Sequence, residues 1–201
     1  GFQHSTAVPD NIGGAILFNR KNSFSKGDLV FTTKGSTSDT VKPKERLRIT
    51  SDGQIGVNKS SPKEWNTSYR SLQIYDGGYI AGSTDDSFVA IGANNYLDTG
   101  NTYDYTNSDF ASQLYQVDGQ LIFRNAASGT AAAAITWSER FRITGIGSVG
   151  IGYNDPNAKL HIASGTDSAV GDATNPALQI GSDTNYRFAV HTTNEQAIIA
   201  N

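Results

Sequence analysis

The chain of 201 residues contains no cysteine and no methionine. Without cysteine the protein forms no disulfide, and no thiol is present to bind a metal or to act as a nucleophile. Charged residues make up 17% of the sequence, against about 25% in an ordinary soluble domain. The net charge is only −3, so nothing in the composition calls for a nucleic acid or an anionic membrane as a partner.

Long apolar runs are also missing. No stretch approaches the roughly 18 apolar residues of a membrane-spanning helix, so we expect no membrane insertion. No charged segment followed by an apolar run suggests a signal peptide. The chain starts at Gly1 without an initiator methionine and ends within an apolar run, so we expect a piece of a longer protein.

Residues that favour turns are abundant. Glycine occurs 21 times, and serine, threonine, asparagine and aspartate fill much of the remainder. The polar side chains of this group compete for backbone hydrogen bonds, which disfavours helix interiors and favours turns between short strands. The composition therefore predicts an all-β fold.

An internal repeat organises the chain. Glu45–Pro62 aligns without a gap on Glu139–Pro156, with eight of eighteen positions identical and a period of 94 residues. Two shorter similarities flank this block in the same order, Gly27–Phe31 with Gly119–Phe123 and Leu72–Ile74 with Leu178–Ile180. We therefore predict three modules: the C-terminal part of a first module in 1–62, a complete second module in 63–156 and the start of a third in 157–201.

Each copy of the repeat has the pattern of a β-hairpin. In the first copy Leu47 and Ile49 alternate with Arg46 and Arg48, and the segment Ser51-Asp-Gly53 has the residues of a turn. The second copy turns at Gly145-Ile-Gly147. A polar residue and a proline follow each hairpin, at Ser61-Pro62 and Asp155-Pro156, which predicts about one helical turn.

The hairpin needs a partner for its apolar face, because an isolated two-stranded hairpin is at best marginally stable. Several copies of the chain around a common axis would supply that partner, and three is the preferred number. We expect Gly56 and Gly150 to allow close approach of the backbones there. The predicted trimer core is Leu47, Ile49, Ile55, Val57, Phe141, Ile143, Val149 and Ile151.

The repeat resembles one found in bacteriophage tail fibre and related virion fibre proteins, often upstream of a self-cleaving intramolecular chaperone domain of the endosialidase type. The resemblance is carried by Glu45–Val57 with Ser60-Ser-Pro62, by Glu139–Thr144, and by Pro156-Asn-Ala-Lys-Leu-His-Ile162; Gly13–Phe18 is similar to the segment that precedes it. It implies a homotrimeric, elongated β-fibre on the virion, outside the cell, with other virion tail proteins as partners and a role in host attachment. The chaperone domain itself is not visible in these residues.

Motifs for catalysis or cofactor binding are weak, so we expect no enzyme, no cofactor and no metal. Gly145–Gly150 matches G-x-G-x-x-G, but strand and turn residues follow it where a dinucleotide site needs a helix. His4, His161 and His191 lack metal-ligand spacing. Paired aspartates are plentiful, so a polysaccharide depolymerase stays open as a less favoured alternative.

The basic residues of Lys42–Arg48 are interrupted by Pro43 and Glu45. We interpret them as a solvated strand edge whose charge opposes edge pairing, rather than as a phosphate site.

The segment Asn94–Phe110 mixes aromatic rings with amides and carboxylates. Such a mixture suits sugar binding, in which a ring stacks on the sugar and polar groups bind its hydroxyls. A calcium site using Asp98 and Asp104 is a further alternative, although the spacing is not that of an EF-hand. We favour a loop whose tyrosines pack on the protein. The alternative function is a carbohydrate-binding module of a fibre or an adhesin that contacts a host surface glycan. The candidate contact residues are Tyr96, Asp98, Tyr103, Asp104 and Tyr105.

Overall fold

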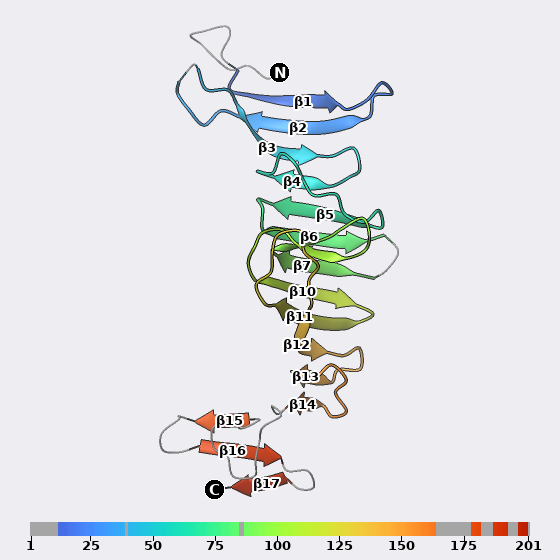
Figure 1. Ribbon diagram of the computed structural model, residues 1–201, viewed down its shortest axis with the longest axis vertical. Coiled ribbons are helices and arrows are strands. Elements are labelled where there is room, and N and C mark those ends of the chain that lie inside the picture. Colours follow the sequence, from blue (N-terminus) through green and yellow to red (C-terminus); the bar gives the residue numbers. More distant parts are fainter. Residues whose placement is uncertain are drawn as a thin grey trace. The chain divides into compact units, whose positions relative to one another are not determined.

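The computed structural model describes residues 12–38, 40–84 and 87–163, together with the strand segments 178–181, 187–192 and 197–200. Within these residues the protein is all-β, with 17 strands and no helix (Figure 1). The expectation of an all-β fold is therefore confirmed. The homotrimer and the fibre remain predictions.

Twelve strands form one mixed sheet, in the order β1-β2-β3-β4-β5-β6-β7-β10-β11-β12-β13-β14. The pairs β4–β5 and β13–β14 are parallel, and the other pairs among β1 to β7 are antiparallel. The strands are β1 (Gly14–Arg20), β2 (Gly27–Thr33), β3 (Lys44–Ile49), β4 (Ile55–Val57), β5 (Tyr69–Ile74), β6 (Gly78–Ser83), β7 (Val89–Ala93), β10 (Ala111–Val117), β11 (Gln120–Ala126), β12 (Ser138–Ile143), β13 (Val149–Ile151) and β14 (Leu160–Ile162).

Two smaller sheets complete the fold. Strands β8 (Asn95–Leu97) and β9 (Tyr103–Tyr105) form an antiparallel pair, and β15 (Leu178–Gly181), β16 (Arg187–Thr192) and β17 (Ala197–Ala200) form a three-stranded sheet. Contacts divide the chain into a first unit, Gly1–Asp118 with Arg124–Ser138, and a second unit, Gly119–Phe123 with Glu139–Asn201. This division follows contacts rather than the sequence repeat, and the predicted module boundaries stay a prediction.

The first copy of the repeat forms the predicted hairpin of β3 and β4. Its turn is closed by the backbone N–H of Gln54, which donates to Thr50 Oγ1 at 3.0 Å, and Gly53 takes a φ of 82° that suits glycine. The second copy closes in the same way, because the N–H of Ser148 donates to Thr144 Oγ1 at 3.0 Å and Gly147 has a φ of 78°. Both hairpin predictions are confirmed.

The predicted helical turn after each hairpin is wrong. No helix occurs in the described residues around Pro62 or Pro156. After the first hairpin, Gln73 on β5 binds the chain instead: its Oε1 accepts from Lys63 N at 2.8 Å, and its Nε2 donates to Lys63 O at 2.9 Å. The side-chain amide of Gln73 thus satisfies the backbone N–H and carbonyl of Lys63, which in a helix would bond to other backbone groups.

The expected similarity between Leu72–Ile74 and Leu178–Ile180 does not hold in space. Strand β5 pairs parallel to β4, with Ile55 opposite Leu72. In the second copy β14 takes that role, with Val149 opposite Leu160, whereas Leu178–Ile180 belongs to the separate sheet of β15 to β17. The structural repeat thus runs β2-β3-β4-β5 and β11-β12-β13-β14.

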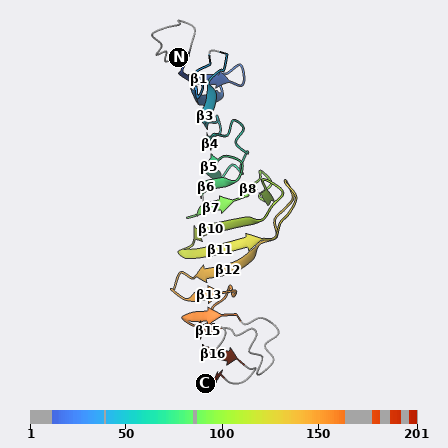
Figure 2. The ribbon, with the colours of Figure 1, turned by 90° about the vertical axis from the view of Figure 1, so that its left-hand side faces the viewer.

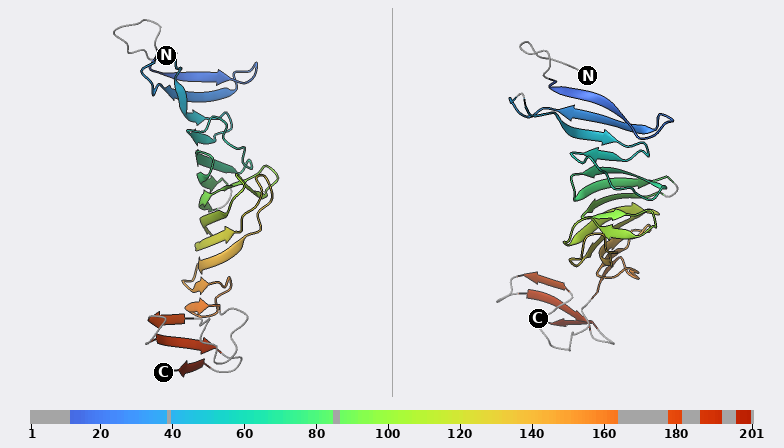
Figure 3. Two further views of the ribbon diagram at one scale, coloured as in Figure 1. Left: turned by 60° about the vertical axis from the view of Figure 1, so that its left-hand side comes forward. Right: turned by 45° about the horizontal axis from the view of Figure 1, so that its top comes forward.

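The buried core of the first unit lies on one side of its sheet only. It forms two hydrophobic clusters. The first is Trp65 with Tyr79 and Ala81 of β6, Ala90 of β7 and Leu97 of β8, and the second is Tyr105 of β9, Ala111 of β10 and Ala126 of β11. Figures 2 and 3 show β8, β9 and the loops around them projecting to this same side. Side chains on the other side of the sheet are left without a covering layer in the described part of the chain.

Candidate functional site

The uncovered side of the sheet carries two ladders of directly opposed residues. Cross-strand partners share a face, so the registers of eight neighbouring strands define each ladder. Ladder A is Phe18, Leu29, Ile49, Ile55, Leu72, Ile80, Ile91 and Leu114. Ladder B is Ile16, Phe31, Leu47, Val57, Ile74, Gly78, Ala93 and Ser112.

Neither ladder contains a charged residue. None of their residues is fully buried, and Phe18 at 57% and Ile91 at 56% are the most exposed of the large side chains in the ladders. A contiguous apolar patch of this kind is unusual on a soluble monomer and is typical of a surface that binds another molecule.

The predicted core residues of the first copy all lie on this face. Leu47 and Val57 are partners in ladder B, and Ile49 and Ile55 are partners in ladder A. All four are half-buried, so the single chain neither seals them nor leaves them fully exposed.

The predicted core residues of the second copy share one face of their own strands. Phe141 lies opposite Ile151, and Ile143 lies opposite Val149. Ile151 is 42% exposed and the other three are half-buried. The pairing matches that of the first copy position by position.

Gly56 and Gly150 do not serve the apolar face as expected. A Cβ on Gly56 would meet Lys59 O and the ring of Pro62, and one on Gly150 would meet Tyr153 O. Both glycines therefore point to the covered side, where they let the following loop lie close against the strand.

The covered side contains buried polar side chains beside its hydrophobic clusters. Gln54, Ser71, Gln73 and Gln113 are each less than 5% exposed, and hydrogen bonds link the first three. Gln54 Oε1 accepts from Ser71 N at 2.9 Å and from Ser71 Oγ at 2.7 Å, and Gln73 Nε2 donates to Ser71 Oγ at 2.9 Å. Buried amides of this kind are tolerated because their hydrogen bonds are satisfied.

Tyr79 is the centre of this covered layer. Its ring lies across Gly92, where no side chain would fit, and it contacts Trp65 edge-on with centroids 4.6 Å apart. Its hydroxyl donates to Asn95 Oδ1 at 2.6 Å and accepts from Gln113 Nε2 at 2.5 Å. Burial raises the pKa of Tyr79 far above its ordinary value. Tyr79 and the buried amides were not among the residues predicted from the sequence. The amides could have been found from the uncharged polar residues that alternate with apolar ones in β5 and β10.

A cation also lies within this layer. The guanidinium of Arg124 lies over the rings of Tyr103, Tyr115 and Trp137, at 4.7, 4.8 and 4.4 Å from their centroids. Its Nε donates to Gln113 Oε1 at 2.7 Å. The aromatic rings of this region are thus held in place by the chain's own arginine.

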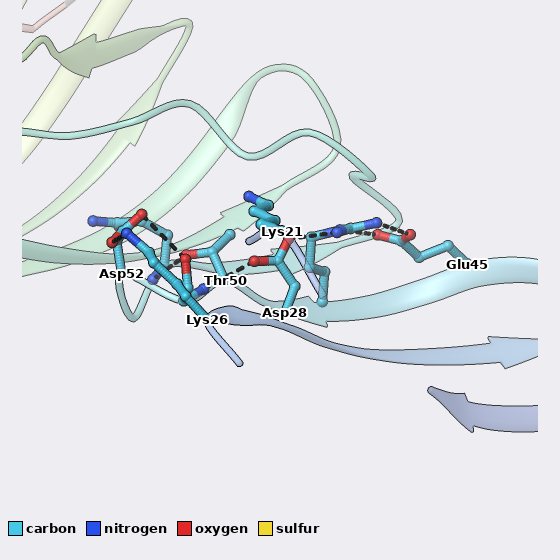
Figure 4. Close-up of polar contacts among 9 residues, drawn as sticks. Lys21, Lys26, Asp28, Glu45, Thr50 and Asp52 are labelled. Carbon is cyan, nitrogen blue, oxygen red and sulfur yellow. Dashed lines mark hydrogen bonds and ion pairs between the residues drawn. The ribbon is translucent and has the colours of Figure 1, made fainter. Parts of the chain in front are cut away.

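A buried ionic network lies at the turn of the first hairpin (Figure 4). The side chain of Asp28 is 1% exposed; its carboxylate accepts from Ser51 N at 2.9 Å and pairs with Arg48 at 2.5 Å and Lys21 at 3.1 Å. Burial opposes ionisation of Asp28, but the hydrogen bonds from Ser51, Arg48 and Lys21 outweigh it and hold its pKa below the ordinary value.

Arg48 is shared between two carboxylates. Glu45 receives two of its N–H groups, at 2.8 and 2.6 Å, and a register shift between Phe31 and Thr32 helps to bring Glu45 to the same side of β3. The hydrogen bonds from Arg48 to Glu45 are the largest cause of the raised pKa of Arg48. The interpretation of this segment as a solvated edge is therefore wrong for Arg48, because β3 pairs on both sides and the charge is internally neutralised.

An open cleft of about 890 Å³ lies beside this network in the first unit. Asp28, Arg48, Gln54, Glu64, Trp65 and Arg70 contribute to its lining. Its lining includes both cations and anions, and the two innermost charges, Asp28 and Arg48, already neutralise each other. The charged residues of the lining are four cations, Lys21, Arg48, Lys63 and Arg70, and three anions, Asp28, Asp52 and Glu64, so the two signs nearly balance.

The tyrosine-rich segment forms the hairpin of β8 and β9 rather than an irregular loop. Tyr105 is 5% exposed and donates to Ala127 O at 2.5 Å, and the half-buried Tyr103 contacts Trp137 edge-on at 5.9 Å. Burial raises the pKa of Tyr103. These two rings are packed within the protein.

Tyr96, Asp98 and Asp104 are half-buried, and Tyr96 packs against the first hydrophobic cluster. Lys63 Nζ lies 4.8 Å from the centroid of the Tyr96 ring. Burial, followed by repulsion from Asp98, raises the pKa of Asp104. Contact of this region with a glycan stays a prediction.

In the described residues, no group of three or more histidine, cysteine, aspartate or glutamate side chains lies close enough to hold a metal ion. No helix in the described part of the chain is long and apolar enough to cross a membrane.

Comparison with known proteins gives no family assignment. No protein-family model matches the chain. A search of curated proteins likewise finds no match.

Proposed function

We propose that this chain is a structural segment of a bacteriophage tail fibre or a similar virion appendage. In this proposal the segment assembles as a homotrimer through its uncovered apolar face, and supports host attachment by holding the receptor-binding part of the appendage away from the particle. Other virion tail proteins are its further partners.

The observation that carries the proposal is the continuous apolar surface on the side of the sheet that the first unit leaves uncovered. The chain's own loops and the pair of β8 and β9 cover one side of the sheet, where the hydrophobic clusters and the buried amides lie, and leave ladders A and B without a covering layer. A monomer would gain further stability by covering ladders A and B as well, because removing apolar surface from water is the main driving force of folding. Such an arrangement is favourable when other molecules supply the missing layer.

The sequence repeat favours a second copy of the same chain as that layer. The apolar residues of β3 and β4 recur in β12 and β13, in the same cross-strand register and 94 residues further on. An unrelated partner would need a matching surface with the same period, whereas another copy of this chain has it by identity. The resemblance to virion fibre proteins likewise implies a homotrimeric, β-structured fibre.

The mass of the protein in solution tests this proposal. We expect light scattering to give three times the chain mass of 21.5 kDa, independent of dilution over the accessible range. A folded monomer with a cooperative thermal transition would refute the proposal, since its apolar ladders would then be stable in water.

A further inference from the structure

We infer that ladder A lies along the axis of the trimer, so that each level of the assembly consists of the same residue from three copies. Ile91 meets Ile91, Leu72 meets Leu72, and so on along the ladder. This inference rests on the proposed function and deepens it, because it says which of the two apolar ladders forms the centre of the interface.

The relative direction of the copies follows from symmetry. A closed trimer of identical chains has cyclic symmetry, and a rotation about its axis leaves every copy pointing the same way. Residues related by the axis therefore lie at the same height. A residue near the axis has its own equivalents as neighbours.

The choice between the two ladders follows from side-chain volume. Ladder A has an aliphatic or aromatic side chain at every level from β1 to β10. Ladder B ends in Gly78, Ala93 and Ser112, so at these levels it offers little or no apolar side chain. An axis lined by these three residues would enclose cavities, and cavities destabilise protein cores.

The position of ladder A on the face agrees with this choice. Ladder B flanks it on one side, and on the other side lie Arg70, Gly82, Val89 and Gln116, which are partners across β5, β6, β7 and β10. Ladder A is thus bordered by a row that contains a charge and an amide. A central apolar row with a polar border is the usual anatomy of a stable interface.

The exposures of ladder A in β6, β7 and β10 support the same assignment. Ile80 is 42%, Ile91 is 56% and Leu114 is 39% exposed in the single chain. These three residues lie at the levels where ladder B has no large side chain. Ladder A is therefore the main apolar surface that neighbouring copies can bury there.

The absence of cysteine from the sequence makes a clean crosslinking test possible. Ile91→Cys places a thiol on ladder A, and Ala93→Cys places one on ladder B in the same strand and on the same face, about 7 Å away. A disulfide needs Cα atoms within roughly 4.4–6.8 Å. We expect oxidised Ile91→Cys protein to form disulfide-linked pairs on a non-reducing gel, with at most two of every three chains linked. Oxidised Ala93→Cys protein should stay mostly unlinked.

A second pair of variants tests the direction of the copies. Phe18→Cys and Leu114→Cys lie at opposite ends of ladder A. We expect each variant to link with itself, and chains of the two variants mixed before assembly to give no band that contains both. Mixed linkage of residues 18 and 114 would overturn the parallel arrangement.

Light scattering of each reduced variant separates failure of this inference from failure of the proposed function. If the variants are trimeric but Ala93→Cys links and Ile91→Cys does not, ladder B is axial and the inference is wrong while the proposed function stands. The inference is equally wrong if the trimer forms and neither variant links. If the unmodified protein is a monomer, the proposed function fails, and this inference fails with it.

Discussion

The two copies of the repeat differ mainly on the side of the sheet that the chain covers itself. On the open side Leu47 is replaced by Phe141 and Ile55 by Val149, so the residues stay apolar. On the covered side the chemistry changes: Asp28 and Gln54 of the first copy correspond to Gln120 and Ser148 of the second, and Lys59 corresponds to Tyr153.

The two copies have the same strand pairing, but different side-chain contacts stabilise the covered side in each. In the first copy Gln73 binds the loop through Lys63, and Lys59 pairs with Asp76 at 2.8 Å. In the second copy His161 occupies the place opposite Gly150 and stacks on Tyr153, with centroids 4.0 Å apart.

The difference has a physical reason under the proposed assembly. Contacts on the covered side are made within one chain, so a change there needs compensation only from its own neighbours. The open side would meet copies of itself, and a polar substitution would be repeated in every copy at once. The comparison therefore predicts that the two sides respond differently to substitution.

The largest effect is expected on the open side. Leu47→Asp or Ile143→Asp would place three carboxylates in an apolar interface, where burial of an unpaired charge is strongly unfavourable. We expect either variant to abolish the trimer, as measured by light scattering.

Arg46→Ala is the matched control for Leu47→Asp. Arg46 is the neighbouring residue and bonds Thr33 and Asn58 rather than joining a ladder. It should assemble like the unmodified chain. Normal assembly of the Asp variants would show that the interface lies elsewhere.

The next largest effect is expected from the glycines that lie against the loops. Gly56→Ala and Gly150→Ala would force the following loop away from the strand, and overpacking of this kind costs about 1–3 kcal/mol. We expect the larger loss at Gly56, because Gln73 and Lys59 hold its loop. The measurement is the free energy of unfolding at a fixed protein concentration.

Gly77→Ala serves as the control, since a Cβ there has no atom within 4 Å. Equal stability of all three variants would contradict the close packing of loop on strand.

A smaller effect is expected from Asp28→Gln, which gives the first copy the amide type found at Gln120 in the second. Loss of a buried charge-assisted contact costs about 1–3 kcal/mol, and we expect the lower half of this range because Glu45 still pairs with Arg48.

The effect of Asp28→Gln should depend on pH. The folded pKa of Asp28 is lowered below its ordinary value, so its contribution is present above that value, about 3.9, and is lost as the pH falls through the folded pKa. The stability difference between the variant and the unmodified protein should therefore shrink below about pH 4. A difference of equal size at pH 7 and in strong acid would rule out the ionised pair as its cause.

The smallest effect is expected from Asp52→Ala. Asp52 pairs with Lys26 at 2.8 Å, but the two side chains are 57% and 49% exposed, and such surface pairs contribute little. The second copy has the exposed Ile146 at this place and closes its turn with the same hydrogen bonds. The melting temperature should stay within experimental error, and a clear decrease would mean that the turn depends on this pair.

Several features of the fold could be predicted from the sequence. Alternation of Leu47 and Ile49 with arginines, and the glycine of each turn, depend on neighbours along the chain and gave both hairpins correctly. The parallel pairing of β14 with β13 was not predicted, because it depends on where the loop after β13 returns the chain. The sequence similarity of Leu72–Ile74 to Leu178–Ile180 pointed to a segment that pairs with β16 instead. The first helical turn was wrong because the amide of Gln73, distant in sequence, binds the backbone of Lys63.

The apolar face was predicted only as far as the repeat reached. Leu47, Ile49, Ile55 and Val57 follow from local alternation, but their continuation through Ile80, Ile91 and Leu114 requires the register of strands that the sequence does not align. Tyr103 and Tyr105 were grouped with glycan-contact residues because composition cannot say whether a ring is packed, and Arg124 and Trp137 that hold Tyr103 lie far along the chain.

The sequence by itself determined the strands, the turns and the repetition of the module, because these depend on side-chain alternation and on glycine at fixed places. Only the tertiary structure decided which side of the sheet the chain covers. The loops and the hairpin of β8 and β9 fold back over the side that carries the hydrophobic clusters and buried amides such as Gln113. Ladders A and B on the other side stay uncovered. Such contacts join residues far apart in sequence, and local patterns carry no record of them.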